Sequence, residues 1–483
     1  MCKSQKFFMI FNRFNKIFQN RIFKVGSMSL LATILTRAIN LISVPVFSRI
    51  LNTSEYGRVE VFMTHVSIFT IVLGLDFHGT VGKGRLDHSD DEDGFLCSGI
   101  LLTSIAAAII VAVINIFFGY LQGIFRLERW LVNIMLLYSY AIFLMSYRSA
   151  DYNFFYEYKK NMRMTVTVAV LNFVLSLVFV KVFFDNAHVL GRVLGATIPT
   201  AICGAIVYIG YIRRGYMTFK HSYNSYFWKF GVPLIPHNLS HIVLSSSDKV
   251  MIDGMISSAA SGIYSLSYTL GMMIQVVSEA LNQVFLPWLY RKLQVEEHQQ
   301  VRKVQKMYLL VYCLAVFPVL SVSPEIVKVI GDRDYWDGTN IILWIVFATF
   351  LNFTYTLYVN IEFFYRKTAL ISLGTFMAAI INVSLNILFL KEYGYYFAAV
   401  STVISYGALL LFHAIIVNYA LKIKLVDGLF LFSVVLLVFG VTGLLQLFLD
   451  SIIIRIFIGM IFECISAVVL FIMYKRTDSN FLT

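Results

Sequence analysis

One arginine in a long apolar stretch of this sequence has the chemistry to hold a charged cargo. Arg37 follows Lys24 by 13 residues, which is about 20 Å along a helix at 1.5 Å per residue. A cation at that depth must face protein or water, because exposing it to lipid costs about 2.5 kcal/mol or more. We interpret Arg37 as a residue that binds an anionic substrate group. The alternative is a structural arginine bonded to helix ends or to a carboxylate.

Three further charged residues lie near the far ends of apolar stretches. The segment SSSDKVMIDG places Asp248 and Lys249 about 20 residues after Trp228, and Arg49 has a similar place in the first apolar stretch. Twenty residues of helix span about 30 Å, so these three are predicted rim residues. They either close an outer gate or anchor their helices at the interface.

Two acidic residues, Asp76 and Glu279, end other apolar stretches on the opposite side. Each can form an ion pair with Arg37 or Lys249 in one state of a transport cycle. The alternative is that both only mark where the lipid layer ends. We therefore treat them as ion-pair candidates.

The elements that must position these charges are membrane spans. The chain of 483 residues is 59% hydrophobic and 14% charged, whereas a soluble protein carries about 25% charged residues. Its net charge is +12, but the basic residues lie mostly in short loops, so no nucleic-acid partner is expected. The five cysteines are widely spaced and show neither a metal-binding nor a disulfide pattern.

We predict an all-α, polytopic integral membrane protein with about fourteen spans, within a range of twelve to fourteen. The predicted spans are 25–50, 57–77, 95–119, 130–149, 164–184, 192–212, 228–251, 259–287, 303–323, 338–361, 368–390, 394–420, 427–449 and 451–474. Of the 39 Lys and Arg residues, 27 fall on the side of the N-terminus and 11 on the other side, which places both termini in the cytoplasm. The first apolar run exceeds signal-peptide length and is interpreted as a retained span.

Two segments on the predicted cytoplasmic side are rich in charged or aromatic residues. RLDHSDDEDG, residues 85–94, is expected to be a solvated loop. YSYAIFLMSYRSADYNFFYEYKK, residues 138–160, is expected to form an interfacial aromatic belt. Stacking of its rings on an incoming sugar is the alternative.

An internal repeat relates the two parts of the chain. Residues 23–26 read FKVG and residues 228–231 read WKFG, an offset of 205 residues. The same offset relates Gly57 to Gly262, so both pairs keep the same spacing. Matches in order at one offset indicate an internal duplication.

A second pair of segments supports the repeat and fixes its extent. NFVLSLVFVK at 172–181 matches NVSLNILFLK at 382–391 at an offset of 210. We predict two pseudo-symmetric six-helix lobes, residues 1–215 and 216–421, followed by a terminal helix pair in 422–483. Parallel repeats of this kind are a transporter plan, with the substrate between the lobes.

The repeat also pairs Arg37 with a histidine. Shifting Thr36 by 205 residues lands on His241, so Arg37 and His241 have neighbouring equivalent depths and can line one cavity. Histidine titrates near physiological pH, which fits proton coupling. The alternative is a histidine that is satisfied by packing.

Several of these stretches resemble one family. They are similar to the polysaccharide-biosynthesis flippases of the multidrug/oligosaccharidyl-lipid/polysaccharide exporter superfamily. The stretches are VPVFSRILNTSEYG, FWKFGVPLIPHNLS, SDKVMI and SGIYSLSY. The resemblance implies an alternating-access flippase that moves an undecaprenyl-diphosphate-linked oligosaccharide, of O-antigen or capsule type, across the bacterial inner membrane. Arg37 would bind the diphosphate, and the lipid tail would follow a groove near the last two helices. Coupling to H⁺ or Na⁺ would need no cofactor, and membrane lipids, a polysaccharide polymerase and a chain-length regulator are implied partners.

Two other functions stay open at this point. A cation-coupled drug or small-molecule antiporter of the same superfamily should have an acidic cavity, against which Arg37 argues. An integral-membrane polysaccharide polymerase or ligase would carry a large outer loop, whereas the predicted outer loops are short. The sequence contains no GxxxxGK[ST] motif and no catalytic constellation, so we expect a transporter that does not use ATP directly.

Overall fold

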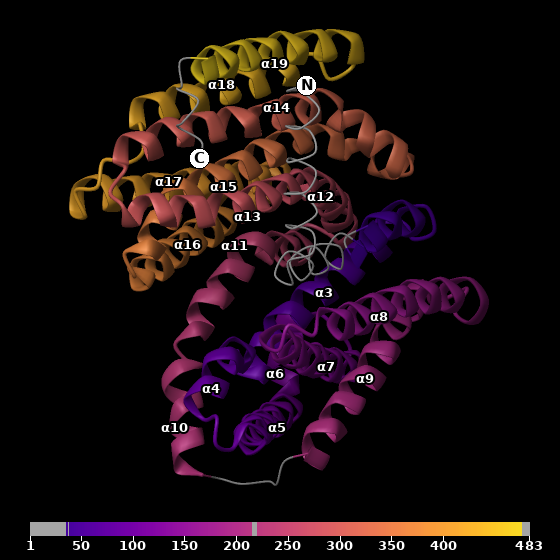
Figure 1. The fold of residues 1–483 in the computed structure, drawn as a ribbon. Coiled ribbons are helices and arrows are strands. Elements are labelled where there is room, and N and C mark those ends of the chain that lie inside the picture. The colour runs from indigo at the N-terminus through magenta and orange to yellow at the C-terminus, as the bar shows by residue number, and fades with distance from the viewer. Residues whose placement is uncertain (1–34, 37, 215–219, 476–483) are drawn as a thin grey trace, which may run out of the picture. The chain divides into compact units, whose positions relative to one another are not determined.

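The computed structural model describes residues 35, 36, 38–214 and 220–475, and in them the regular secondary structure is helical, without a β-strand (Figure 1). The chain divides into two compact units. Among the described residues, unit 1 comprises 35, 36, 38–47, 65–214 and 220–235, and unit 2 comprises 48–64 and 236–475. Helix α3 therefore begins in unit 2 and ends in unit 1.

Unit 1 contains the end of α3, helices α4 to α10 and the start of α11. The bounds are α3 Thr53–Gly74, η1 Phe77–Thr80, α4 Val81–Asp87, α5 Glu92–Ile116, α6 Phe118–Phe125, α7 Arg129–Phe154, α8 Tyr158–Val178, η2 Phe179–Phe183, α9 His188–Arg214 and α10 His221–Phe230. A buried aromatic core joins η1, α5, α7, α9 and α10, with Phe77, Phe95, Tyr147 and Phe227 all fully buried.

Unit 2 contains the start of α3 and the remaining helices. The bounds are α11 Leu234–Met255, α12 Ser258–Gly271, η3 Met272–Ile274, α13 Gln275–Gln294, α14 His298–Ile330, η4 Arg333–Gly338, α15 Thr339–Phe364, α16 Thr368–Tyr393, α17 Tyr396–Ile415, η5 Ile416–Ala420, α18 Gly428–Gln446 and α19 Ile452–Lys475. Tyr264 of α12, Ile345 of α15 and Leu390 of α16 lie in its buried core.

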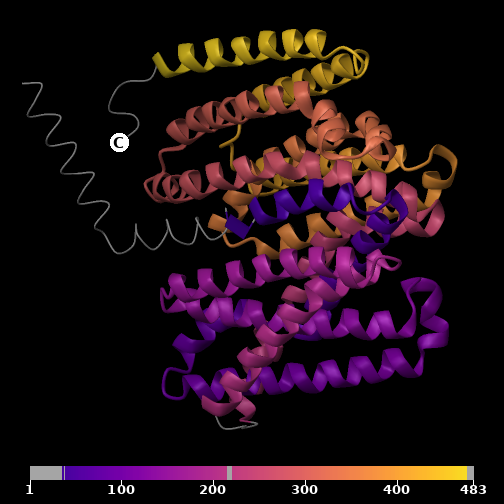
Figure 2. The ribbon, with the colours of Figure 1, turned by 90° about the vertical axis from the view of Figure 1, so that its right-hand side faces the viewer.

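Within the described residues, eleven helical segments are long and apolar enough to cross a membrane. They are Thr53–Gly74, Glu92–Ile116, Arg129–Phe154, Tyr158–Phe183, His188–Arg214, His298–Ile330, Arg333–Phe364, Thr368–Tyr393, Tyr396–Ala420, Gly428–Gln446 and Ile452–Lys475. In each unit the long helices run side by side (Figure 2). Eleven of the predicted spans coincide with these segments, which confirms a multi-pass membrane protein. The first predicted span lies largely outside the described residues, so the count of fourteen stays a prediction.

Two other predicted spans, 228–251 and 259–287, are each interrupted. A turn at residues 231–233 separates α10 from α11, and the 3₁₀ helix η3 separates α12 from α13. Pro233 explains the first break, because proline has no N–H and disfavours helical geometry in the residue before it. Trp228 therefore belongs to another helix than Asp248, so the distance along one continuous helix does not apply, and the place of Asp248 at the outer rim stays a prediction. Asp248 lies 14 residues after the start of α11, or about 21 Å.

Helices α3 and α12 cross in unit 2 where both carry a glycine. A Cβ atom on Gly57 would lie 2.0 Å from the carbonyl oxygen of Ser258 and 2.8 Å from the backbone nitrogen of Gly262. A Cβ atom on Gly262 would lie 1.9 Å from the carbonyl oxygen of Thr53. Only glycine permits two backbones to approach this closely. Gly57 and Gly262 are the pair that the repeat offset relates, so equivalent residues of the predicted repeat pack against each other.

The N-terminus of α18 is fixed by a capping carboxylate. Asp427 Oδ1 accepts a hydrogen bond from the backbone N–H of Phe430 at 3.2 Å, and Oδ2 lies 2.5 Å from Nζ of Lys306 on α14. The hydrogen bond from Lys306, followed by the one from Phe430, lowers the pKa of Asp427 below its ordinary value of 3.8. The cap thereby ties α18 to α14.

We expect Lys306→Gln to lower the melting temperature only slightly at pH 7, because a partly exposed ion pair contributes about 1 kcal/mol or less. Since the pKa of Asp427 is depressed in the folded state, this stabilisation is complete above the ordinary pKa and disappears as the pH falls through the folded-state pKa. Thermal unfolding of the detergent-solubilised protein should show a difference that shrinks below about pH 4. A difference of the same size at pH 3 would contradict the assignment.

Candidate functional site

Asp248 lies at the centre of a buried polar cluster in unit 2. Its side chain belongs to α11, and the residue is only 1% exposed. Oδ1 accepts a hydrogen bond from Asn386 Nδ2 of α16 at 2.6 Å. Oδ2 accepts hydrogen bonds from the hydroxyls of Tyr264 on α12 and Thr402 on α17, each at 2.7 Å. The carboxylate therefore joins four helices of one unit.

The cluster extends along α16 and α17. Ser401 Oγ donates to Asn386 Oδ1 at 2.7 Å, and Asn382 Oδ1 accepts from Ser247 Oγ at 3.3 Å. Asn382 and Asn386 are four residues apart on α16 and are both fully buried. This spacing presents both amides on the same face of the helix.

The electrostatic balance of the cluster is incomplete. Among the described residues, no Lys, Arg or His forms an ion pair with Asp248. Three hydrogen bonds replace part of the lost water, but an ionised carboxylate remains costly to bury without a counter-charge. Asp248 therefore needs either a proton or a cation. Asn386 and Thr402 both donate hydrogen bonds to this carboxylate, and coupling to H⁺ or Na⁺ stays a prediction.

Arg49, a predicted rim residue, contacts the end of α14. Its Nη2 donates to the carbonyl oxygen of Val329 at 2.8 Å, and the neighbouring Ser48 Oγ donates to that of Ile330 at 3.0 Å. These carbonyls end a helix and have no partner in its own backbone. A cation there also interacts favourably with the helix dipole. Arg49 thus attaches the segment before α3 to α14 within unit 2.

Lys249 forms an ion pair with Glu60, which was not among the predicted partners. Its Nζ lies 2.7 Å from Oε2 of Glu60 on α3, and the two side chains are 12% and 22% exposed. The predicted partners lie elsewhere, because Asp76 is buried at the start of η1, 3.3 Å from His78, and Glu279 belongs to α13. In this structure Lys249 therefore pairs with Glu60 instead of with Asp76 or Glu279.

The structure describes one of the two residues predicted to bind the substrate. Arg37 lies outside the described residues. His241 is exposed on α11, four residues after His237. The assignment of Arg37 and His241 to one cavity stays a prediction.

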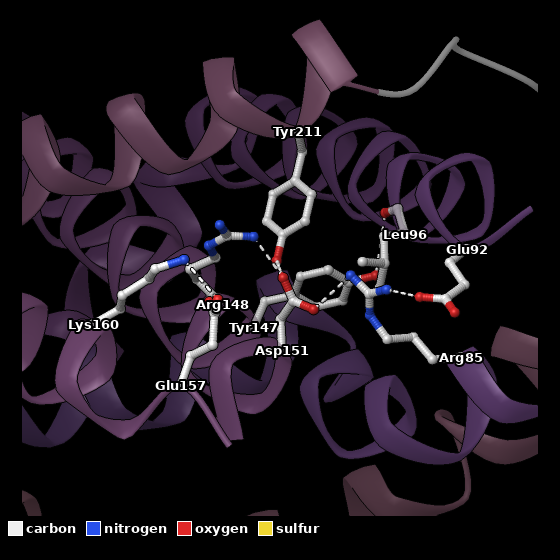
Figure 3. A network of polar contacts seen from close by, with 9 residues as sticks. All are labelled: Arg85, Glu92, Leu96, Tyr147, Arg148, Asp151, Glu157, Lys160 and Tyr211. Carbon is white, nitrogen blue, oxygen red and sulfur yellow. Dashed lines mark hydrogen bonds and ion pairs between the residues drawn. The ribbon is translucent and has the colours of Figure 1, made fainter. Parts of the chain in front are cut away.

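A second polar cluster lies in unit 1, on the face where α4, α5, α7 and α9 meet (Figure 3). Asp151 of α7 is at its centre. Its Oδ1 lies 2.6 Å from Nη2 of Arg85, and its Oδ2 lies 2.5 Å from Nη1 of Arg148. Tyr211 of α9 donates to the same Oδ2 at 2.9 Å. Arg85 also pairs with Glu92 at the start of α5.

The charges of this second cluster are balanced, because Arg85 and Arg148 face Asp151 and Glu92. It is therefore a structural clamp and not a free anion site. The predictions for the segments 85–94 and 138–160 are wrong in part. Arg85 is 5% exposed, so the segment 85–94 is not a solvated loop throughout. Tyr147 is fully buried and donates to the carbonyl oxygen of Leu96 at 3.1 Å, so part of the aromatic segment 138–160 is core.

Two ion pairs with buried members in unit 2 were not predicted from the sequence. His413 Nδ1 of α17 lies 2.9 Å from Glu362 Oε1 of α15, and both side chains are fully buried. Arg455 of α19, also fully buried, pairs with Glu325 of α14. The pair of Arg455 could have been expected from the sequence, because an arginine inside a predicted span needs a partner. Glu362 and His413 stand close to helix ends, where charged groups usually meet water.

Comparison with known proteins shows which family the chain belongs to. Residues 22–293 match the family described as polysaccharide biosynthesis protein. The chain belongs to this family. The match covers more than half of the 483 residues and confirms the resemblance seen in the sequence. Two relatives of this chain are from Haemophilus influenzae strain Rd. "Lsg locus putative protein 1" is 25% identical over 381 residues, which cover 75% of this chain and 90% of that protein. "Uncharacterized membrane protein" is 20% identical over 374 residues, which cover 74% and 88%.

Solved structures share the fold of this chain. "Lipid II flippase MurJ, inward closed conformation" aligns with a TM-score of 0.70 and 15% identity, over 92% of this chain and 99% of that chain. A multidrug resistance MATE family transporter of the MOP superfamily, in its inward-facing conformation, aligns with a TM-score of 0.57 and 11% identity, over 81% and 96%. At these identities the comparison establishes a common fold.

Proposed function

We propose that this protein is a flippase that translocates an undecaprenyl-diphosphate-linked oligosaccharide of O-antigen or capsule type. It would act in the bacterial inner membrane with both termini in the cytoplasm. Membership of the polysaccharide biosynthesis family and the fold shared with a lipid II flippase support a lipid-linked saccharide as substrate. A polysaccharide polymerase and a chain-length regulator would act on the product at the outer face.

Transport by this flippase takes its direction from a gradient of H⁺ or Na⁺. The single observation that carries this part of the proposal is the buried Asp248, which no described basic residue neutralises. Buried ionisable residues within membrane proteins mark ion pathways and proton relays. Binding of the cation to Asp248 would favour the packing of α11 against α12, α16 and α17, and its release would loosen that packing.

We expect Asp248→Asn to abolish transport while leaving the protein folded. The amide keeps the shape of the carboxylate and its hydrogen bonds to Tyr264 and Thr402 after rotation of the hydroxyls, so the stability loss should be about 1–3 kcal/mol. The neutral side chain no longer attracts a cation. Cell-surface glycan, measured in a strain whose own gene is deleted, should stay near background. Asp253→Asn on the same helix is the matched control, because Asp253 bonds to Ser258 Oγ at 2.6 Å outside this cluster, and should restore the glycan.

The same strain separates the proposal from its rivals. Loss of a flippase leaves the lipid-linked repeat unit in the inner leaflet, where a membrane-impermeant glycosidase cannot reach it in spheroplasts. Loss of a polymerase or ligase would leave that unit accessible from outside. Loss of a drug antiporter would raise drug sensitivity and leave surface glycan unchanged.

A further inference from the structure

Glu362 and His413 form a fully buried pair, and each side chain has one polar atom without a hydrogen-bond partner among the described residues. Glu362 lies on α15 and His413 on α17, with Nδ1 and Oε1 2.9 Å apart. Both side chains are fully buried, so neither reaches water in this structure. The second polar atom of each, Glu362 Oε2 and His413 Nε2, has no hydrogen-bond partner among the described residues.

Two aromatic rings pack against the imidazole of His413. The ring of Tyr355 on α15 stacks on the imidazole with 5.8 Å between ring centres, and Phe412 packs edge-on at 5.3 Å. On α16, a Cβ atom on Gly374 would lie 2.8 Å from His413 Nε2, so this glycine leaves room for the ring.

Within the described residues, no third charged side chain forms an ion pair with Glu362 or His413. Arg366 and Lys367, which follow Glu362 along the chain, form none with it. The other titratable groups of the flanking helices are Tyr358 of α15, Tyr396 and Tyr406 of α17, and Lys391, Glu392 and Tyr393 at the end of α16. None of these forms a hydrogen bond with the pair.

Counting the charges of the pair shows the effect of the shared proton. With one proton shared between them, the two side chains have no net charge, whether as carboxylate and imidazolium or as carboxylic acid and imidazole. Without that proton they have a net charge of −1 in a site that excludes water. Such a charge is strongly disfavoured when buried and uncompensated.

We propose that Glu362 and His413 form a proton-binding site of unit 2 whose proton exchanges only when α15 and α17 part. The inference rests on the proposed function for its role, which is to make proton release part of the transport cycle. The proton binds at His413 Nε2 or Glu362 Oε2 and leaves to water from the same atom. Histidine and carboxylate pairs of this kind serve as proton relays in membrane pumps and transporters.

Helix α17 gives this site a physical connection to Asp248. It holds both Thr402, which donates to Asp248, and His413, 11 residues further along or about 16 Å. A movement of α17 that breaks one contact displaces the other. The carboxylate of Asp248 and the acid–base pair are thus held by one rigid element within unit 2.

The direct test counts protons and needs no transported substrate. Full-length protein is unfolded in weakly buffered detergent solution at pH 8, and the released protons are measured with a pH-indicator dye. Free histidine and glutamic acid, with ordinary pKa values of about 6.5 and 4.3, are almost fully deprotonated at that pH. Wild type should release about one proton more than Glu362→Gln, which removes the need for the shared proton.

Three further variants keep the result interpretable. Glu392→Gln replaces an exposed glutamate on α16 and should release as much as wild type. The double variant Glu362→Gln/His413→Gln should release as little as Glu362→Gln. His413→Gln should release as much as wild type, because a buried Glu362 without a basic partner must itself hold a proton. The double variant keeps a hydrogen bond between α15 and α17 without a titratable group, so it serves if a single variant fails to fold.

The role in transport has its own readout, the surface glycan of complemented cells grown at several external pH values. Glu362→Gln should flatten the pH dependence that wild type shows. Equal proton release from wild type, Glu362→Gln and the double variant would overturn the site, whatever the protein transports. A proton difference with an unchanged pH dependence would overturn its role in transport. If deleting the gene left surface glycan unchanged while the proton difference persisted, the proposed function would fail and the site would stand.

Discussion

Replacing Asp151 with alanine should lower the free energy of unfolding by about 3–5 kcal/mol, because it leaves two buried arginines without their shared carboxylate. Arg85 and Arg148 are 6% and 13% exposed in their side chains and cannot regain water without moving α4 or α7. Tyr211 loses its acceptor as well. Thermal unfolding in detergent measures the global loss. Modification of Cys97 on α5, which is 1% exposed, by a maleimide measures local opening.

The matched control for this prediction lies on the same polar network. Glu157 pairs with Lys160 at 2.6 Å, but both side chains are well exposed, at 36% and 61%. Glu157→Ala should therefore cost about 1 kcal/mol or less and leave the reactivity of Cys97 unchanged. Equal effects of Asp151→Ala and Glu157→Ala would show that burial of the ion pairs of Asp151 contributes nothing to the free energy of unfolding.

Replacing Gly57 with alanine should be nearly as damaging, although it adds one methyl group. That methyl would lie 2.0 Å from a backbone carbonyl oxygen of α12, and neither backbone can yield without shifting a helix. Overpacking typically costs about 1–3 kcal/mol, and a clash between two backbones belongs at or above the upper end of that range. Lower yield of monodisperse protein and a lower melting temperature are the expected observations.

Gly440 of α18 provides the control, since a Cβ atom there meets nothing within 4 Å. Alanine is the better helix former, so Gly440→Ala should be neutral or stabilising by about 0.5–1 kcal/mol. Gly57→Ala and Gly440→Ala should thus have opposite signs. If Gly57→Ala were tolerated as well as Gly440→Ala, the close approach of α3 and α12 would not exist in solution.

The membrane architecture was largely predictable, because it depends on local composition. Long apolar runs made eleven spans visible, with ends within a few residues of those observed. The breaks inside the predicted spans 228–251 and 259–287 were harder to predict. Gly231 and Pro233 mark the first break in the sequence, but η3 consists of the apolar residues Met272, Met273 and Ile274, which look like part of a span.

The contacts of the candidate site were not predictable, because they join residues far apart in sequence. Asp248 was recognised as an unusual charge, yet its partners Asn386 and Thr402 lie 138 and 154 residues further on. Lys249 and Asp248 are neighbours in sequence and point to different helices, one to α3 and the other to α16 and α17. Hydropathy assigns a depth to such residues, whereas the direction of the side chain depends on how the helices pack.

The contact of Gly57 with Gly262 has a meaning for the origin of the chain. In a symmetric dimer, a residue that touches its own copy does so only on the two-fold axis. If the two halves of the repeat descend from one half-length ancestor, the glycine now at 57 and the glycine now at 262 were one position that faced itself. A single mutation there would have placed two side chains in the same contact. Duplication and fusion separated the two positions genetically, but the backbone distance still demands glycine at both.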